Sequence, residues 1–193
     1  MSMASPFQQT VDDALLTRAR DGEGAAQAEL FRLFGRPVYS LARRLLVKPE
    51  LAEDVLQDTF VEVLRNLSAF RGEAPFGMWL RRIAVNHCLM HLRSPWQRRR
   101  LELDDSDESG MLRSVDAGLD ALDLERALEA LPSEARAVVW LHDVEGYTHQ
   151  EIGRMLNATT SFSKSQLARA YVRMHDWAVN EAGEPKCTPV LSN

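Results

Sequence analysis

The second half of the chain contains the stretch Gly146-Tyr-Thr-His-Gln-Glu-Ile-Gly-Arg-Met-Leu-Asn-Ala-Thr-Thr160. Thr148 and Glu151 have the spacing of a capping box, in which each side chain satisfies a free backbone N–H at the start of a helix. We therefore expect a short helix that ends at Leu156. Asn157 can then adopt the left-handed conformation that often follows a helix.

A second helix follows within a few residues and runs to about residue 179, with Thr159 or Thr160 as its cap. Two helices joined by so short a turn form a helix-turn-helix, whose second helix can enter the major groove of DNA. Arg and Gln can meet base edges there, and Lys and Ser can hold phosphates. The face of this helix carries Phe162, Gln166, Arg169 and Arg173, with Lys164 and Ser165 beside them. A solvated basic face is the alternative interpretation, because such faces are common.

The rest of the chain shows the same periodicity, so an all-α fold is expected. No Asn-Gly or Asp-Gly turn lies between alternating apolar runs, as strand hairpins would require. We predict helices over 12–21, over 25–47 with a kink near Pro37, after Pro49, and over 76–94, 119–130 and 133–144. Residues 1–10 lack this pattern, and we expect both ends of the chain to fray.

The composition excludes several classes of protein. The chain has 193 residues, of which 45% are hydrophobic and 26% charged, unlike collagen-like, disulfide-scaffold or wholly disordered chains. No apolar run reaches the roughly 18 residues of a membrane span, and the N-terminus lacks a signal peptide, so we expect a cytoplasmic protein without direct membrane insertion. Cys88 and Cys187 are expected to stay reduced.

The net charge of −5 is unevenly distributed. Six arginines and no acid give +6 from Ala74 to Leu101, whereas ten acids against two arginines give −8 from Glu102 to Glu129. The acidic, Gly- and Ser-bearing stretch is typical of a linker. We predict two small helical domains joined by a flexible acidic linker, with the helix-turn-helix in the second domain. Their bounds are 11–96 and 118–180, with the linker over 97–117 and a flexible tail over 181–193.

Two helix faces in the first domain are candidate binding surfaces. The helix after Pro49 carries a polar, acidic face made of Glu53, Asp54, Gln57 and Asp58. The helix over 76–94 carries a face made of Trp79, Arg82, Asn86 and Arg93. This second face combines a stacking surface with cations and an amide, the chemistry that holds unpaired bases. The alternative is that Trp79 is a core residue and the arginines are merely solvated.

His87 and His91 have the i, i+4 spacing of helical zinc ligands. No recognisable pattern supplies a third ligand, and the Glu of an HExxH motif is absent, so structural histidines are the favoured interpretation. No phosphate-binding glycine loop and no nucleophile with its base is present. We expect no catalytic residues, no cofactor and no metal, and therefore not an enzyme.

Two blocks of sequence resemble bacterial sigma factors of the extracytoplasmic-function (ECF) group, in the sigma-70 superfamily. The first block consists of Leu51-Ala-Glu-Asp-Val-Leu-Gln-Asp-Thr-Phe60, Phe70-Arg-Gly72, Phe76-Gly-Met-Trp-Leu-Arg-Arg-Ile-Ala-Val-Asn86 and Leu92-Arg93. The second consists of Leu131-Pro132, Gly146 to Leu156, and Lys164-Ser-Gln-Leu-Ala-Arg-Ala170. The resemblance covers residues 11–178 and implies a promoter-specificity subunit that binds core RNA polymerase and initiates transcription of a specific regulon.

The resemblance also implies partners for each surface. The acidic face of Glu53, Asp54, Gln57 and Asp58 would dock on the clamp of the largest polymerase subunit, and the second domain on the flap of the second largest. The minus-ten element would be recognised and opened by Phe70, Arg71, Phe76, Trp79, Arg82, Asn86 and Arg93. The final helix would read the minus-thirty-five element, with Ser161, Phe162, Lys164, Gln166, Arg169 and Arg173 as its candidate contacts. The acidic linker would thread the polymerase channel, and an anti-sigma factor would hold the protein inactive.

The chain departs from the family pattern in the turn over 157–163, which places Ser163 where a buried valine is common. Gln166 also stands where the family usually has arginine, which would favour adenine over guanine. Two other hypotheses stay open: a stand-alone helix-turn-helix repressor or activator, and a metal-dependent helical enzyme centred on His87 and His91. A stand-alone regulator would leave the acidic face near Asp54 without a role.

Overall fold

The computed structural model describes residues 6–100 and 121–182, and their side chains over 6–92 and 124–180. All regular structure within these ranges is helical, which confirms the predicted all-α class. The chain divides into two compact units, Met1–Asp104 and Asp105–Asn193. Most of the predicted linker and nearly all of the predicted tail lie outside the described residues.

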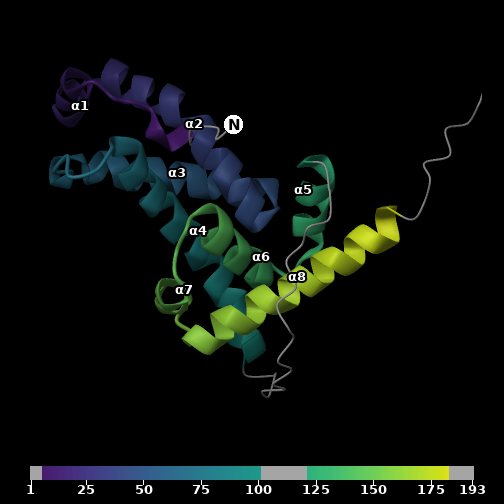
Figure 1. Ribbon diagram of the computed structural model, residues 1–193. Coiled ribbons are helices and arrows are strands. Elements are labelled where there is room, and N and C mark those ends of the chain that lie inside the picture. Colours follow the sequence, from purple (N-terminus) through teal and green to yellow (C-terminus); the bar gives the residue numbers. More distant parts are fainter. Residues whose placement is uncertain (1–5, 101–120, 183–193) are drawn as a thin grey trace, which may run out of the picture. The chain divides into compact units, whose positions relative to one another are not determined.

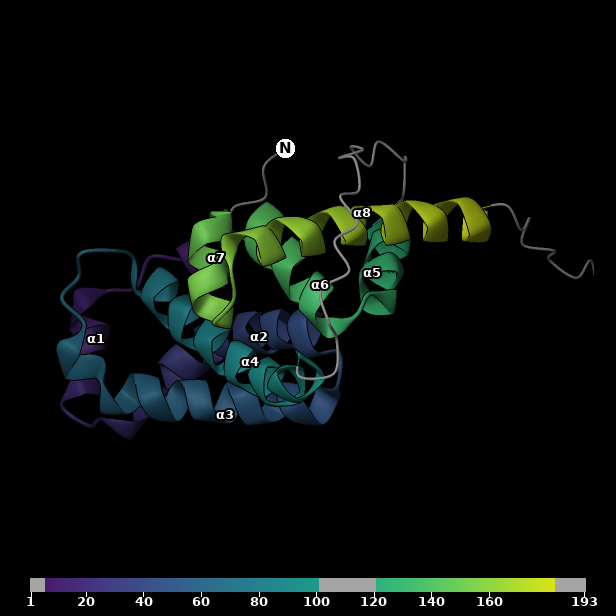
Figure 2. The ribbon, with the colours of Figure 1, turned by 90° about the horizontal axis from the view of Figure 1, so that it is seen from below.

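The first unit is built on three long helices. Its elements are η1 (Pro6–Gln8), α1 (Asp13–Arg20), α2 (Gly24–Leu46), α3 (Pro49–Arg65), η2 (Leu67–Ala69) and α4 (Phe76–Arg100). Each of α2, α3 and α4 contacts the other two, and Figures 1 and 2 show them packed together. Their apolar stripes meet in a core that includes Leu30, Phe34, Leu45, Val55, Val63, Leu80, Val85 and Leu89. This burial is the main force that holds the unit together.

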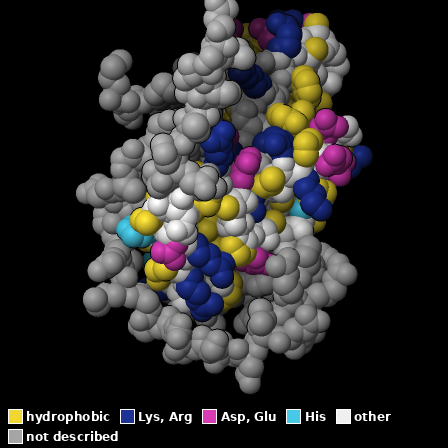
Figure 3. All heavy atoms as spheres, turned by 90° about the vertical axis from the view of Figure 1, so that its right-hand side faces the viewer, with side chains coloured by type: hydrophobic (Ala, Val, Ile, Leu, Met, Phe, Trp, Pro, Cys, Tyr) yellow, Lys and Arg dark blue, Asp and Glu magenta, His cyan; other side chains and the backbone are white. Residues whose placement is uncertain are grey.

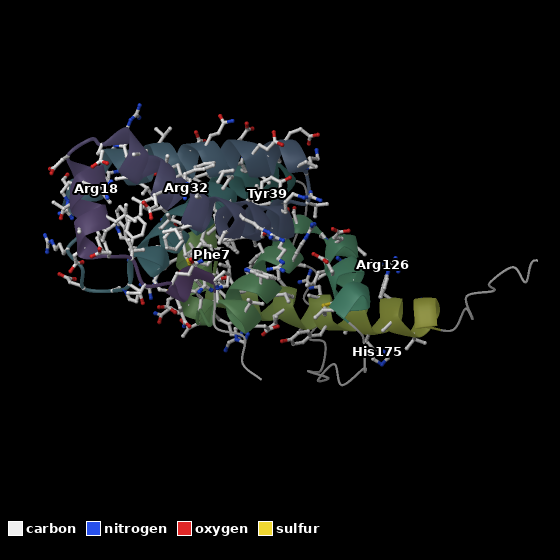
Figure 4. The ribbon with its side chains drawn as sticks, turned by 90° about the horizontal axis from the view of Figure 1, so that it is seen from above. Phe7, Arg18, Arg32, Tyr39, Arg126 and His175 are labelled. Atoms are coloured by element: carbon white, nitrogen blue, oxygen red, sulfur yellow. The ribbon has the colours of Figure 1, made fainter. Side chains whose placement is uncertain are left out.

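The N-terminal segment belongs to this core, so the expectation that residues 1–10 fray is wrong for Pro6–Gln8. Phe7 (labelled in Figure 4) is only 4% exposed, and η1 contacts both α2 and α4. The Arg81 guanidinium lies 5.8 Å from the centre of the Phe7 ring, within the range of a cation–π contact. The prediction was wrong because Phe7 is buried by residues far along the chain, and a single buried ring gives residues 1–10 no periodic pattern.

Of the two helices that contain a proline, one agrees with its predicted bounds and the other extends beyond them. The helix α2 runs from Gly24 to Leu46 with Pro37 inside it, as predicted over 25–47. The helix α4 ends at Arg100 rather than near residue 94, although Pro95 lies within it. A proline cannot donate the i to i−4 hydrogen bond, so it usually ends or kinks a helix. The residues after it are mainly glutamine and arginine, which favour helix, and the helix continues.

The second unit packs four helices and a π-turn around its own core. Its elements are α5 (Ala121–Ala130), α6 (Ser133–Val139), the π-turn η3 (Trp140–Val144), α7 (His149–Leu156) and α8 (Thr160–Ala182). The single helix predicted over 133–144 is therefore an α-helix that widens into a π-turn. The long helix α8 contacts α5, α6 and α7, and both ribbon views show α7 beside its start.

A buried arginine joins α6 to the end of α5. Arg136 is 7% exposed, and its Nη2 donates a hydrogen bond to the Leu131 carbonyl oxygen at 2.9 Å. Burial lowers the pKa of this guanidinium, while the carboxylates of Glu129 and Glu134 oppose the shift. Even so, an arginine keeps its charge at physiological pH. This contact helps to orient α6, the helix that the π-turn and α7 follow in the chain.

Candidate nucleic-acid interface

Three aromatic rings lie close together at the start of α4. Phe70 follows η2, and Phe76 and Trp79 lie in the first turn of α4. Ring centres are 5.5 Å apart for Phe70 and Phe76, 5.3 Å for Phe70 and Trp79, and 5.8 Å for Phe76 and Trp79. These distances fall within the range in which aromatic rings attract one another. We call this group the aromatic cluster.

The aromatic cluster is anchored on one side and open on the other. Phe76 is 4% exposed and packs edge-on against Phe34 of α2, with ring centres 5.5 Å apart. Phe70 and Trp79 are half-buried. Trp79 is therefore neither a fully buried core residue nor a solvated one. Its position suits a ring held by its neighbours with part of its surface available for stacking.

Polar side chains continue this surface along α4. Arg82 and Asn86 are exposed and follow Trp79 at three and seven positions, so they share one helix face. Arg71 is 82% exposed in the loop between η2 and α4, 3.9 Å from Glu73. Arg81 lies on a different face, against Phe7. The side chain of Arg93 lies outside the described residues. The structure thus brings together Phe70, Phe76, Trp79, Arg82 and Asn86.

The acidic face predicted on α3 is present and exposed. Glu53, Asp54, Gln57 and Asp58 are all exposed, whereas the opposite side of the helix is buried through Ala52, Val55, Phe60 and Val63. Val61, three positions after Asp58, is 46% exposed and extends this face with an apolar side chain. A helix face that pairs acids with exposed apolar surface is suited to a basic protein partner.

The two histidines of α4 lie against α3. His87 Nε2 lies 2.8 Å from Glu62 Oε2, with the His87 side chain 16% exposed. Cys88 beside it is buried. Within the part of the chain that the structure describes, no group of three or more His, Cys, Asp or Glu side chains is arranged to hold a metal ion. The contact to Glu62 gives His87 a structural partner across the two helices.

The helix-turn-helix has the local geometry predicted for it. The backbone N–H of Glu151 donates to Thr148 Oγ1 at 3.3 Å, and the N–H of Thr148 donates to Glu151 Oε2 at 2.9 Å, which completes the capping box. The backbone N–H and the hydroxyl of Thr148 both donate to Glu151 Oε2, and these two hydrogen bonds lower the pKa of the Glu151 carboxyl. Asn157 has φ 54°, the predicted left-handed conformation. Thr159, rather than Thr160, caps α8 by accepting the Phe162 N–H at 3.1 Å.

The helix α8 has one buried side, and its basic side chains are distributed over the remaining surface. Ser163, Leu167, Ala170 and Met174 are buried against the rest of the unit. Ser161, Lys164, Arg169 and Arg173 are exposed, and Phe162 and Gln166 are half-buried between the two sides. On the face shown in Figure 3, lysine and arginine side chains lie in separate groups between hydrophobic and acidic ones.

The sequence predictions missed a set of polar contacts inside the helix-turn-helix. His149 Nδ1 lies 3.0 Å from Ser163 Oγ, and the rings of His142 and His149 are stacked with centres 4.5 Å apart. The hydroxyl of Tyr171 donates to Asp143 at 2.8 Å. A serine at a helix position that faces the core was the one available signal, because a buried hydroxyl requires a partner.

Comparison with known proteins agrees with this geometry. The family model for sigma-70 region 2 matches residues 30–100, and the model for sigma-70 region 4 matches residues 121–174. The ECF RNA polymerase sigma factor SigM of Mycobacterium tuberculosis is 34% identical over 167 residues, which cover 84% of this chain and 82% of that protein. The ECF RNA polymerase sigma-E factor of Haemophilus influenzae is 27% identical over 176 residues, covering 84% and 93%.

Among solved structures, one similar chain is the sigma factor RpoE in complex with the anti-sigma factor NepR from Bartonella quintana. It has 22% sequence identity and a TM-score of 0.49, and the match covers 78% of this chain and 94% of that one.

The two family matches and the 34% identical relative show that this chain belongs to the ECF group of RNA polymerase sigma factors. It is a promoter-specificity subunit of RNA polymerase. Sigma factors bind core polymerase and promoter DNA, and they regulate transcription rather than act as enzymes. Among the described residues, no helix combines the length and apolar character needed to cross a lipid bilayer.

Proposed function

We propose that this sigma factor reads a minus-thirty-five element with α8 and recognises and opens a minus-ten element with the aromatic cluster and the face of Arg82 and Asn86. Residues 11–96 and 118–180 would act as the two functional domains. The protein would work in the cytoplasm, without enzymatic activity of its own, and would direct polymerase to a specific regulon.

The observation that carries the proposal is the two-sided character of α8. Leu167, Ala170 and Met174 anchor it through its buried side, while Lys164, Arg169 and Arg173 are exposed around the rest of its surface. A helix held in this way by a short capped helix can present its first turns to the major groove. Arginine can bond base edges there, and Gln166 would favour adenine.

The aromatic cluster supports the minus-ten assignment. Unstacking a duplex step costs about 1.4 kcal/mol, so an open region needs protein groups that hold the released bases. Stacking on an aromatic side chain contributes about 1 to 3 kcal/mol per base. Trp79 is half-buried against Phe70 and Phe76, which limits the conformational freedom that stacking would otherwise cost. Arg71 and Arg82 are exposed nearby in sequence and could hold the backbone phosphates.

The exposed face of α3 supports a dock on polymerase. Glu53, Asp54 and Asp58 form one acidic surface, and they would pair with basic groups on the clamp of the largest subunit. The second domain would contact the flap of the second largest subunit. We also propose an anti-sigma factor as a partner, in keeping with the complex reported for the similar sigma factor from Bartonella quintana. Exposed apolar side chains such as Phe31 and Val172 offer surface for such a contact.

The decisive experiment is run-off transcription from fragmented genomic DNA of the source bacterium, with core polymerase and with or without this protein. New transcripts that require the protein, followed by mapping of their start sites, would establish both promoter elements. Tight binding to duplex DNA without polymerase, together with no binding to core polymerase, would instead support a stand-alone regulator. Core binding without transcripts from any fragment would contradict promoter recognition by these surfaces.

A further inference from the structure

A buried polar contact joins the two helices of the helix-turn-helix. Ser163 lies in the first turn of α8 and is fully buried, with 0% of its surface exposed. Its hydroxyl lies 3.0 Å from Nδ1 of His149, the first residue of α7. A buried hydroxyl without a partner destabilises the folded state, so this hydrogen bond favours one placement of α8 on α7.

Further contacts connect this pair to the π-turn η3. The ring of His149 stacks on that of His142, with centres 4.5 Å apart and planes 19° apart. His142 Nδ1 lies 2.7 Å from Asp143 Oδ1, and the Tyr171 hydroxyl donates to both oxygens of Asp143 at 2.8 and 3.0 Å. The contacts therefore begin and end on α8, at Ser163 and Tyr171, and pass through α7 and η3.

We propose that His149 is a positioning residue of the helix-turn-helix, which holds the start of α8 through Ser163 and His142 and makes duplex reading by α8 sensitive to acid. The duplex-reading part rests on the function proposed above. Ser163 lies between Phe162 and Lys164, which are candidate DNA contacts, so a shift at Ser163 would move both of them. Loss of a contact can thus change DNA recognition although His149 itself need not touch DNA.

The charges around His149 decide the direction of the pH effect. The titratable groups that face it are His142 and Asp143 from η3 and Lys164 from α8, and its own helix carries Glu151 two residues on. Burial, with the charges of His142 and Lys164, lowers the pKa of the His149 imidazole, and Asp143 only partly offsets this. Protonation would place a partly buried cation beside two other basic groups.

The sign of the linkage follows from this lowered pKa. An unfolded histidine takes up its proton near pH 6.5, whereas the folded unit resists it until lower pH. The stability that neutral His149 contributes is thus complete above about pH 6.5 and is lost as pH falls through the folded pKa. Each unit between the two pKa values corresponds to about a tenfold change in the opening equilibrium.

Amide hydrogen exchange of the full chain at pH 7.5 and 5.5, corrected for intrinsic rates, tests the positioning role. Wild type should lose protection in α7 and the first turns of α8 at the lower pH. His149→Gln, which cannot titrate, should show a smaller loss. His175→Gln is the matched control, because His175 also lies on α8 but its side chain is exposed (Figure 4). An unchanged pH dependence in His149→Gln would overturn the proposal.

A second pair of variants separates positioning from general damage. His149→Phe should expose α8 to exchange, because it leaves the Ser163 hydroxyl buried without a partner. The double variant His149→Phe with Ser163→Ala removes both polar partners and should recover much of the protection at pH 7.5. Equal losses in the single and double variants would contradict coupling between the two side chains.

Transcription then tests the DNA part. Output from a mapped promoter is divided by output from the same promoter with its minus-thirty-five element replaced, which cancels effects of pH on polymerase. This ratio should fall several-fold from pH 7.5 to 6 for wild type and less for His149→Gln. If the ratio falls equally in wild type and His149→Gln, the proposed effect of His149 on duplex reading is wrong. Absence of all sigma-dependent transcripts at pH 7.5 would refute the proposed function instead, while the exchange results would still decide the role of His149.

Discussion

The carbonyl oxygen of Phe7 occupies the space in which a side chain on residue 77 would begin. A Cβ built on Gly77 would lie 2.1 Å from that oxygen and 2.8 Å from Cε1 of Phe34. Gly77 is the second residue of α4, next to Phe76 of the aromatic cluster. The absence of a side chain at this position thus lets the N-terminal segment pack directly on the start of α4.

Gly77→Ala should therefore destabilise the first unit, by about 1 to 3 kcal/mol, because either the backbone of η1 or the core around Phe34 must move. Urea unfolding followed by the fluorescence of the tryptophans would measure the loss. The double variant with Phe7→Ala should lose less than the sum of the two single variants, since a loosened η1 no longer resists the new methyl group. Strict additivity would show that the contact with Phe7 is not the cause.

Asp54→Arg should weaken binding to core polymerase by at least about tenfold, because it reverses a charge in the centre of the exposed acidic face. Asp54 is exposed on α3 and makes no contribution to the core, so the fold should be unchanged. Asp21→Arg, an exposed charge reversal at the end of α1, is the matched control. Native gel shift with purified core polymerase would measure both. Equal affinity in the Asp54 variant and wild type would argue against a clamp contact on this face.

Arg169→Ala should reduce promoter use while leaving core binding intact. A base-edge contact by arginine contributes about 1 to 3 kcal/mol, so transcription from a mapped promoter should fall at low sigma concentration. Arg36→Ala removes the same type of exposed side chain from α2 and should have little effect. A parallel loss of core binding in the Arg169 variant would contradict a role confined to DNA.

Trp79→Ala should slow promoter opening more than it weakens initial binding. Stacking of a released base on an aromatic ring contributes about 1 to 3 kcal/mol, which applies only after the strands separate. The fluorescence of 2-aminopurine placed in the minus-ten region would report opening. Trp79→Phe keeps a ring in the aromatic cluster and should retain most of the opening rate. If both variants open promoters at the wild-type rate, the cluster has a purely structural role.

Tyr171 should ionise well above the ordinary range of a tyrosine side chain. Burial, together with the hydrogen bond to the Asp143 carboxylate, raises the pKa of Tyr171 to about 12, from an ordinary value near 10. The neutral phenol is thus favoured in the folded state, and its contribution to stability is complete below about pH 10 and is lost as pH rises through 12. Titration of phenolate absorbance in wild type and Tyr171→Phe would show this, because the variant should lack the step near pH 12.

Local sequence was sufficient to predict the helical class and most helix ends. The capping box of Thr148 and Glu151 and the left-handed Asn157 were both predicted, because each depends on hydrogen bonds or backbone preferences within a few residues. The exposed acids of α3 and the exposed basic side chains of α8 were also predictable, since helical periodicity assigns side chains to faces. The roles of these surfaces in binding polymerase and DNA stay predictions.

The tertiary structure alone decided which distant residues meet. Nothing near Phe7 in the sequence indicates that Gly77 leaves room for it, and the expected fraying of residues 1–10 overlooked that contact. Likewise, His149 and Ser163 are each ordinary in their own helix, and only the packing of α7 on α8 brings their polar atoms within 3.0 Å. Contacts of this kind depend on how several helices pack at once, and the local hydrogen bonds and periodicity that determine each helix carry no information about that packing.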